Sequence, residues 1–257
     1  MNFKKETEIH FYKIFEVCKN SWNYGCGSYL FNGREYKYYK TYYPKQKLLY
    51  DIVKNKSEVL EVGVYMGHSI LIMLLSNPKL NITAIDIDEK FAAPSIEYLT
   101  KIFDNCKINF IKNDSVTAIK NLKNKKFDFF HLDGELDHFK MTSEFLNCLS
   151  LVKGNKMTIL FNGGKSCRHL ISSIKKIFKV ESLIKIDGPS QNYLLVINVK
   201  DLNSNLIKSF KQNIFFKNIL LKIIKYINCL FNAFFLLIYR IMPEFGIKFI
   251  KKIFFNK

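Results

Sequence analysis

A short glycine-containing turn constrains the fold of this chain more than any other feature of its sequence. The apolar run that ends at Val62 predicts a strand, and the apolar run after Gly67 predicts a helix. Gly63 and Gly67 flank the turn between them, where glycine lets the backbone turn tightly and approach a ligand closely. The exposed N–H groups of the helix start attract an electronegative group. The sequence therefore predicts a β-α unit that binds a nucleoside-bearing cofactor.

The spacing of the two glycines argues against a dinucleotide. A dinucleotide site uses G-x-G-x-x-G so that a pyrophosphate can lie on bare backbone, but Tyr65 fills the middle glycine position here. Glu61 would also repel a diphosphate, whereas its carboxylate suits a ligand that carries an ammonium and a sulfonium group. The alternative is an ordinary buried strand followed by a glycine turn, because short glycine motifs often occur by chance.

Downstream of this turn, short apolar runs alternate with helical patterns, which is typical of β-α-β units on a parallel sheet. Asp or Asn lies at or near the end of each predicted strand. Such residues can cap helices, but ligands of open α/β sheets bind beyond the carboxyl ends of the strands, so the repetition favours a site there. These strands are predicted at residues 81–87, 108–114, 127–133 and 156–162.

The region after the fifth strand predicts a different ending to the sheet. A helix is expected over 165–178, followed by strands at 179–187 and 193–199. The short Gly/Pro/Asn loop at 188–192 joins these two strands, which predicts an antiparallel hairpin.

Together these patterns resemble the class I S-adenosylmethionine-dependent methyltransferases, and in particular the small-molecule O-methyltransferases. The motif E-x-G-x-x-x-G-x-S of that family is matched by Glu61, Gly63, Gly67 and Ser69. Sheets of this family end in an antiparallel hairpin, whereas NAD-binding domains continue with parallel strands. The resemblance implies an α/β fold with a Rossmann-like, doubly wound, mostly parallel sheet and S-adenosylmethionine as the cofactor.

The resemblance also implies roles for individual residues. Asp86 would accept hydrogen bonds from both ribose hydroxyls, which suits a carboxylate because it can accept two at once. Asp88 is the alternative for this role, and Asp114 and Ser115 would lie near the adenine. The residues expected around the methionine part of the cofactor are Glu61, Gly63, Tyr65, Gly67 and Ser69.

The catalytic residues should follow the fourth and fifth strands. Residues 131–139 resemble the D-G-x-H-x-Y segment of small-molecule O-methyltransferases, in which the Asp faces the reaction centre and the His can act as a base. Asp133 and His138 are therefore the predicted catalytic residues, although His138 comes two positions later than in that pattern. A histidine in a polar loop can equally be only solvated.

No required metal is predicted. Many relatives bind a divalent cation through that Asp and an Asp-Asp or Asp-Asn pair after the fifth strand, where oxygen ligands suit magnesium. Here Asn162 is followed by Gly163 and Gly164. One neutral amide replaces a charged pair, so a hard cation would lose much of its electrostatic attraction.

Composition says less about function than the motifs do. The formal net charge is +18, which would suit nucleic acid or an anionic membrane. Lys, Asn, Ile and Phe are over-used throughout, however, as an AT-rich coding sequence would produce, so nucleic-acid binding is not expected. The six cysteines form no C-x-x-C pair and no signal peptide is recognised, which favours a cytoplasmic setting.

Two additions flank the expected methyltransferase domain at residues 45–200. Residues 1–44 contain an aromatic and basic run, which could stack on nucleic acid or form a lid over the cofactor cleft, as the N-terminal cap of relatives does; the lid is favoured. Residues 201–257 form a basic, apolar helical tail, whose uninterrupted apolar part at 226–239 is too short to span a bilayer. Its part at 215–257 fits an anionic membrane surface, which would be the inner face of the membrane if the protein is cytoplasmic. The alternative is that it packs on its own domain, or on a second subunit in a homo-oligomer.

The expected function is the transfer of a methyl group from S-adenosylmethionine to a small-molecule or carbohydrate-like acceptor, at oxygen. One alternative is a catalytically silent nucleoside-binding module that docks to membrane or nucleic acid through its basic tail. A second alternative is an NAD-dependent enzyme, which Tyr65 and the terminal hairpin disfavour.

Overall fold

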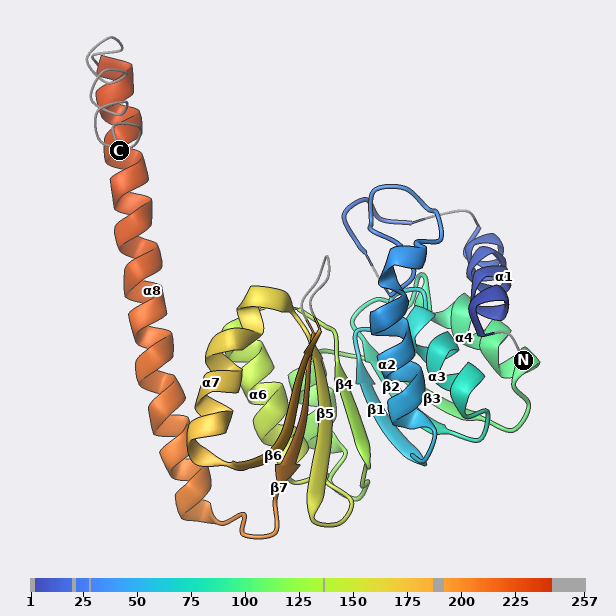
Figure 1. Cartoon of the computed structure of the whole chain (residues 1–257). Coiled ribbons are helices and arrows are strands. Elements are labelled where there is room, and N and C mark those ends of the chain that lie inside the picture. The colour runs from blue at the N-terminus through green and yellow to red at the C-terminus, as the bar shows by residue number, and fades with distance from the viewer. Residues whose placement is uncertain (1–2, 20–21, 28, 136, 187–191, 242–257) are drawn as a thin grey trace. The chain divides into compact units, whose positions relative to one another are not determined.

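This structure, a computed structural model of the whole chain, describes residues 3–19, 22–27, 29–135, 137–186 and 192–241. The chain divides into two compact units, residues 1–207 and 208–257. The first is an α/β unit, and the second is carried by one long helix (Figure 1). The domain limits expected from the sequence, after residues 44 and 200, stay predictions.

A seven-stranded sheet in the order β3-β2-β1-β4-β5-β7-β6 forms the centre of the first unit. Of the described strands, β7 alone runs antiparallel to its neighbours, β5 and β6, and the remaining pairs are parallel. This confirms the predicted sheet with its terminal antiparallel hairpin. The strands are β1 (Glu58–Val62), β2 (Asn81–Asp86), β3 (Lys107–Lys112), β4 (Phe129–Leu132), β5 (Lys156–Asn162), β6 (Lys179–Ile186) and β7 (Asn192–Asn198).

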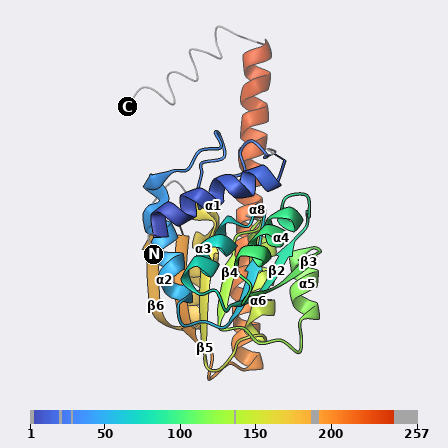
Figure 2. The ribbon, with the colours of Figure 1, turned by 90° about the vertical axis from the view of Figure 1, so that its right-hand side faces the viewer.

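Helices cover both faces of this sheet, which makes it doubly wound. α1, α2, α3 and α4 lie on one face, and α6 and α7 lie on the other, with α5 packed against α6 (Figures 1 and 2). The helices of this unit are α1 (Phe3–Val17), α2 (Tyr43–Val53), α3 (His68–Ser76), α4 (Ala92–Ile102), α5 (Ser115–Asn121), α6 (His138–Leu149) and α7 (Arg168–Ile177).

The observed boundaries differ from the predicted ones at several elements, and two of these differences have a local reason. The strand expected over 127–133 is shortened to β4, because the Asp128 carboxylate turns to accept the backbone N–H groups of Ser57 and Glu58 at the start of β1. The helix expected over 165–178 begins as a 3-10 helix, Gly164–Cys167, before α7. Most of the predicted hairpin turn at 188–192 lies outside the described residues.

The strand register brings the predicted site residues to one edge of the sheet. Val62 at the end of β1 pairs with Ile85 of β2 on one side and with Leu132 of β4 on the other. Each of these three residues is followed by a predicted site residue, namely Gly63, Asp86 and Asp133. These site residues therefore lie next to one another at the carboxyl edge of the sheet. The chain order reverses between β1 and β4, and open α/β sheets bind their ligands at such a switch point.

The second unit is represented by α8 (Ser204–Ile241), a helix of 38 residues that contains no Asp or Glu. Residues 242–257 of the predicted tail lie outside the described part of the chain. Within the described residues, no helix combines the length and apolarity needed to cross a bilayer. Large apolar side chains are nevertheless exposed along α8, namely those of Phe215, Ile219, Leu220, Ile223, Ile224, Tyr226, Ile227, Leu230, Phe231, Phe234, Leu236 and Leu237.

Candidate functional site

A cavity of about 1130 Å³ opens at the carboxyl ends of β1, β2, β4 and β5. Its wall includes Gly63, Tyr65 and Ser69 of the glycine turn and helix start, Asp86 at the end of β2, and Asp88 just after it. The opposite part of the wall comes from residues 23–45 and from the segments after β4 and β5. This volume lies at the upper end of small-molecule sites, so it has room for a nucleoside cofactor and a second ligand.

Gly63 is required by the backbone that lies against it. Its φ is +85°, and a Cβ at this position would lie 2.6 Å from the carbonyl carbon of Asp133 and 2.8 Å from the backbone nitrogen of Gly134. The turn continues with Tyr65 at φ 48° and Gly67 at φ 67°, both left-handed. The close packing of the glycine turn on the end of β4 therefore sets the shape of the cavity beside Gly63 and Asp133.

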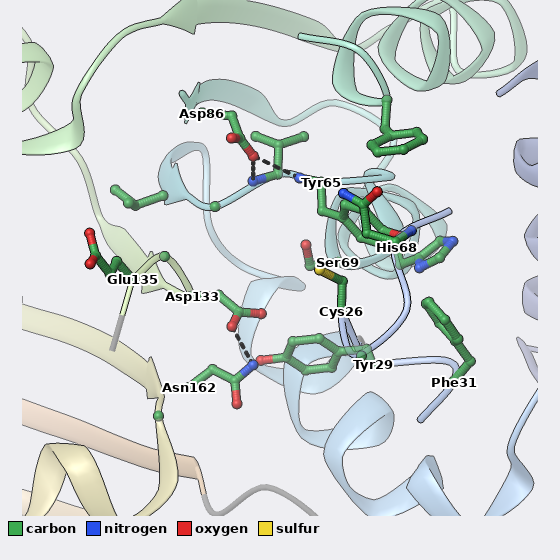
Figure 3. A pocket seen from close by; sticks show the side chains of 18 of the residues that line it. Cys26, Tyr29, Phe31, Tyr65, His68, Ser69, Asp86, Asp133, Glu135 and Asn162 are labelled. Atoms are coloured by element: carbon green, nitrogen blue, oxygen red, sulfur yellow. Dashed lines mark hydrogen bonds between the residues drawn. The ribbon is translucent and has the colours of Figure 1, made fainter. Parts of the chain in front are cut away.

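Asp86 anchors the glycine turn to the end of β2. Its Oδ2 accepts the backbone N–H groups of Val64 at 2.7 Å and Tyr65 at 2.8 Å (Figure 3). Its Oδ1 accepts from the N–H of Asp88 at 3.1 Å. A carboxylate offers about four acceptor positions, so Asp86 can still accept from a ligand in the cavity. Asp88 also lines the cavity and binds the N–H of Lys90 at 2.9 Å.

Glu61 lies fully buried in β1, just before the turn. The Ser69 hydroxyl donates to its Oε1, while its Oε2 has no hydrogen-bond partner in the described part of the chain. His131 Nδ1 lies 3.4 Å from Oε1, and His131 Nε2 is hydrogen-bonded to the hydroxyl of Tyr29 at 2.7 Å. Glu61 is not itself among the residues that line the cavity, but its hydrogen-bond partner Ser69 is. A buried carboxylate oxygen without a partner is costly, and the ammonium of an amino-acid-bearing cofactor would satisfy it. The residues present thus fit S-adenosylmethionine.

The two residues predicted near adenine have different surroundings. Ser115 lines the cavity and donates its hydroxyl proton to the buried carboxyl of Glu144. Asp114 caps α5 by accepting the N–H of Thr117 at 3.0 Å, and its other oxygen lies 3.2 Å from the ammonium of Lys140. Of this pair, Ser115 therefore lies in the cavity lining, where it can contact a ligand, and Asp114 caps the start of α5.

Glu144 gives the protein a pH-dependent stability. Burial raises its pKa to about 7, against the opposing effects of the Ser115 hydrogen bond and the charge of Lys140. Because the folded-state pKa lies above the ordinary value of 4.5, the stabilisation is complete below about pH 4.5 and is lost as the pH rises through 7. Glu144→Gln should keep an acceptor for Ser115 without a buried charge.

We expect Glu144→Gln to raise the free energy of unfolding by on the order of 2–3 kcal/mol above pH 8 and to change it little near pH 4.5. Urea denaturation of both proteins across this pH range measures the difference. A gain that does not vary with pH would show that the Glu144 carboxyl titrates normally in the folded protein.

Asp133 and His138, the predicted catalytic pair, are separated by the structure. Asp133 lines the cavity, and the side-chain amide of Asn162 donates to its Oδ1 (Figure 3). Burial raises the pKa of Asp133, while Lys45 and His131 act in the opposite direction. His138 begins α6 and lies outside the described cavity lining; its ring centre is 5.8 Å from that of His169. The assignment of His138 as the base stays a prediction.

Among the cavity residues that were not expected from the sequence are Tyr29, Lys45 and His68. Tyr29 and Lys45 lie side by side, with the Lys45 ammonium 3.9 Å from the ring centre. Burial lowers the pKa of His68 to about 3, so this imidazole is neutral. No local pattern marks these positions, because they reach the cavity through the fold. The sequence signal for this part of the cavity was His131, because it is a polar residue inside an apolar strand.

The N-terminal segment forms one wall of the cavity. Asn23, Cys26 and Phe31 line it, and the backbone N–H of Asn23 donates to the Tyr65 hydroxyl at 3.1 Å. The hydroxyl of Tyr36 links α1 to the start of α3, because it donates to the carbonyl of Phe11 and is hydrogen-bonded to His68. The segment is thus in place to cover a cofactor, and its movement as a lid stays a prediction.

Fold and site together resemble one class of protein. The strand order, the glycine turn and the acidic residues Glu61 in β1 and Asp86 at the end of β2 are similar to those of the class I S-adenosylmethionine-dependent methyltransferases. Residues 45–164 match the family model described as O-methyltransferase. Of the residues that the structure describes, no three His, Cys, Asp or Glu side chains are grouped so that they could hold a metal ion.

Comparison with known proteins agrees with this class. Tapetum-specific methyltransferase 1 of Arabidopsis thaliana is 34% identical over 103 residues, which is 38% of this chain and 43% of that protein. Caffeoyl-CoA O-methyltransferase of Populus kitakamiensis is 33% identical over 104 residues, again 38% of this chain and 43% of that protein. The chain therefore spans less than half the length of the curated relatives it matches.

Solved structures show the same fold. The O-methyltransferase from Bacillus cereus in complex with S-adenosylhomocysteine superposes with a TM-score of 0.52 at 14% identity, covering 74% of this chain and 90% of that chain. The S-adenosylhomocysteine-bound methyltransferase of Podospora anserina gives a TM-score of 0.53 at 14% identity, covering 72% and 86%.

Proposed function

We propose that this protein transfers a methyl group from S-adenosylmethionine to an oxygen of a small-molecule or carbohydrate-like acceptor. The observation that carries the proposal is the buried carboxylate of Glu61, which lies in β1 just before the glycine turn. Its Oε2 has no hydrogen-bond partner among the described residues. The relatives named for methylation of caffeoyl-CoA and flavonoids support a small-molecule acceptor.

The chain's own residues bind and orient the cofactor, which supplies an electrophilic methyl group on a sulfonium. Glu61 accepts from its ammonium group, and the backbone of the turn at Gly63 lies against its methionine part. Asp86 accepts hydrogen bonds from the ribose hydroxyls, using the carboxylate acceptor positions that the N–H groups of the glycine turn do not occupy. Ser115 marks the adenine end of the cavity. Methyl transfer is an in-line displacement, so alignment of the acceptor oxygen contributes much of the catalysis.

The reaction end of the cavity lies at Asp133 and Asn162. The amide of Asn162 points its N–H toward the Asp133 carboxylate (Figure 3), so one neutral donor stands where relatives place charged metal ligands. We propose that a divalent cation is not required. Asp133 then orients the acceptor hydroxyl, and His138 is the base expected from the sequence.

Calorimetric titration with S-adenosylhomocysteine, NAD and ATP tests the cofactor. We expect S-adenosylhomocysteine alone to bind; binding of NAD instead would favour the dehydrogenase alternative. Transfer from labelled S-adenosylmethionine to a panel of phenolic and sugar acceptors tests the activity, and EDTA should leave it unchanged. Activity lost with EDTA and restored by magnesium would show that Asp133 and Asn162 hold a metal. Cofactor binding without transfer to any acceptor would favour the catalytically silent module.

We further propose that α8 binds an anionic membrane surface. Its exposed Ile, Leu, Phe and Tyr side chains are interspersed with lysines, and no carboxylate opposes them between Ser204 and Ile241. Helices of this composition lie in the headgroup plane, where each basic residue near an anionic surface contributes about 1 kcal/mol.

A protein truncated after Ile214 should therefore lose binding to phosphatidylserine vesicles, since every exposed large apolar side chain of α8 follows that residue. We expect binding of the full chain to be weaker in high salt and absent on phosphatidylcholine. Sedimentation with vesicles measures this, with S-adenosylhomocysteine affinity as the control for folding. If the full chain ignores both vesicle types and truncation turns a dimer into a monomer, α8 is an interface between copies.

A further inference from the structure

Lys45 is a lysine in a position that needs an explanation. It lies in the first turn of α2, after Pro44, and only 8% of its surface is exposed. It lines the cavity together with Asp133 and Asn162. Lysines are almost never this buried unless they are paired or functional, because burial takes the ammonium group out of water.

The surroundings of Lys45 lower the pKa of its amine, so that the neutral form becomes accessible. Its Nζ lies 3.9 Å from the centre of the buried Tyr29 ring. Burial lowers the pKa of Lys45 to about 8, although the carboxylate of Asp133 raises it. A minority of Lys45 is thus neutral near physiological pH, and most of it is neutral above about pH 8. Lysines whose pKa is lowered by burial can serve as bases.

The same surroundings stabilise the charge that appears when the amine is protonated. Asp133 interacts electrostatically with Lys45, and its position is fixed by the Asn162 amide. The face of the Tyr29 ring also attracts a cation. Tyr29 cannot take the proton itself, because burial and the charges of Asp133 and Glu61 raise its pKa well above the ordinary value and its hydroxyl is bonded to His131.

We propose that Lys45 is the general base of the methyl transfer. The inference rests on the proposed function of the cavity. The lone pair of Lys45 Nζ forms a bond to the hydroxyl proton of the acceptor as its O–H bond breaks. The acceptor oxygen forms a bond to the methyl carbon, while the sulfur–methyl bond breaks and its electron pair stays on sulfur. Lys45 then returns the proton to water.

The proposal replaces His138 as the base for a geometric reason. His138 lies outside the described lining of the cavity and beside His169, whereas Lys45 lines it. Lys45 also lies eighty-eight positions before Asp133 in the chain, so the two are brought together only by the packing of α2 beside the sheet. The titratable groups that face or surround Lys45 and Asp133 include Tyr29, Glu61, His131 and Cys167.

The first test does not depend on turnover. The full-length protein is labelled with acetic anhydride at a series of pH values, and acetylation of each lysine is measured by peptide mass spectrometry. We expect Lys45 to react with a midpoint near pH 8. Lys47, exposed on the same helix and paired with Asp51, is the internal reference and should titrate no lower than an ordinary lysine. A Lys45 midpoint near 10, or equal to that of Lys47, overturns the proposal.

The second test uses variants with caffeoyl-CoA as the probe acceptor. Lys45→Met and Lys45→Arg should each lower the methyl-transfer rate by about 10²–10⁴-fold and leave S-adenosylhomocysteine affinity unchanged. Arginine keeps the charge but cannot release its proton, so a Lys45→Arg enzyme with the parent rate would show an electrostatic role instead. Lys47→Met is the matched control and should have the parent rate.

The pH–rate profile separates Lys45 from its rival. The methyl-transfer rate of the parent protein should rise with pH to a plateau above pH 8, and this rise should disappear in Lys45→Met. If the rise instead disappears in His138→Ala and persists in Lys45→Met, His138 is the base. A protein that fails to bind S-adenosylhomocysteine contradicts the proposed function, whereas normal binding with an ordinary Lys45 midpoint contradicts only the role of Lys45. The two failures are therefore distinguishable.

Discussion

Gly63→Ala should largely abolish S-adenosylhomocysteine binding and should destabilise the fold as well. Even a single methyl group at this position would lie 2.6 Å from the carbonyl carbon of Asp133 and 2.8 Å from the backbone nitrogen of Gly134. These neighbours are backbone, so they cannot rotate away as a side chain would. The φ of +85° adds strain for any residue with a Cβ. The β1 turn and the end of β4 must therefore move apart, and both of them form the cavity.

Gly154→Ala is the matched control for this change. Gly154 has a similar φ of +80°, but a Cβ there would meet nothing within 4 Å. Its replacement should cost only the backbone strain, about 1 kcal/mol, and should leave cofactor affinity intact. Thermal unfolding and calorimetry measure the two effects separately. Equal losses in both variants would mean that the contact of Gly63 with the end of β4 contributes nothing.

Asp86→Ala should weaken S-adenosylhomocysteine binding by about 1.5–3 kcal/mol, which is the contribution of a hydrogen bond to a charged group. This corresponds to roughly 10-fold to 150-fold in the dissociation constant. The structure adds a second effect, since Asp86 also holds the N–H groups of Val64 and Tyr65. Some stability should be lost together with affinity, so calorimetry must be performed where circular dichroism shows the variant to be folded.

Asp88→Ala distinguishes the two candidates for the ribose hydroxyls. Both carboxylates line the cavity, but Asp88 binds the N–H of Lys90, whereas Asp86 binds the glycine turn. We expect Asp88→Ala to change affinity by less than threefold, about 0.6 kcal/mol. A larger loss in Asp88→Ala than in Asp86→Ala would transfer the ribose assignment to Asp88.

Most of the fold could be predicted because its signals are local. The strand expected over 156–162 coincides with β5, and the apolar runs around Gly63 and Gly67 became β1 and α3. A buried parallel strand reads as a continuous apolar run, and a short Gly/Pro loop between two strands allows only a hairpin. The boundaries of β4 were harder to predict, because the carboxylate of Asp128 caps a different strand.

The candidate site was predictable only in part. The residues near the glycine turn share one short segment, so a motif could place them together. Tyr29, Lys45 and His131 come from three distant segments, and their contacts depend on how α2 and the N-terminal segment pack against the sheet. No periodicity or motif records such contacts. His138 was selected by its type and its sequence neighbourhood, and the structure places its ring beside His169.

The sequence by itself determined the order of strands and helices, the turn that marks the cofactor end, and the class of protein that these features resemble. It did so because backbone propensity, apolar periodicity and glycine geometry act over a few residues. Only the tertiary structure decided why Gly63 must be glycine, which is the backbone of Asp133 and Gly134 packed against it. Only the tertiary structure, too, placed a buried lysine from α2 beside Tyr29 and within the field of Asp133. The energies of these contacts depend on distance in space, and the order of residues along the chain does not contain that distance.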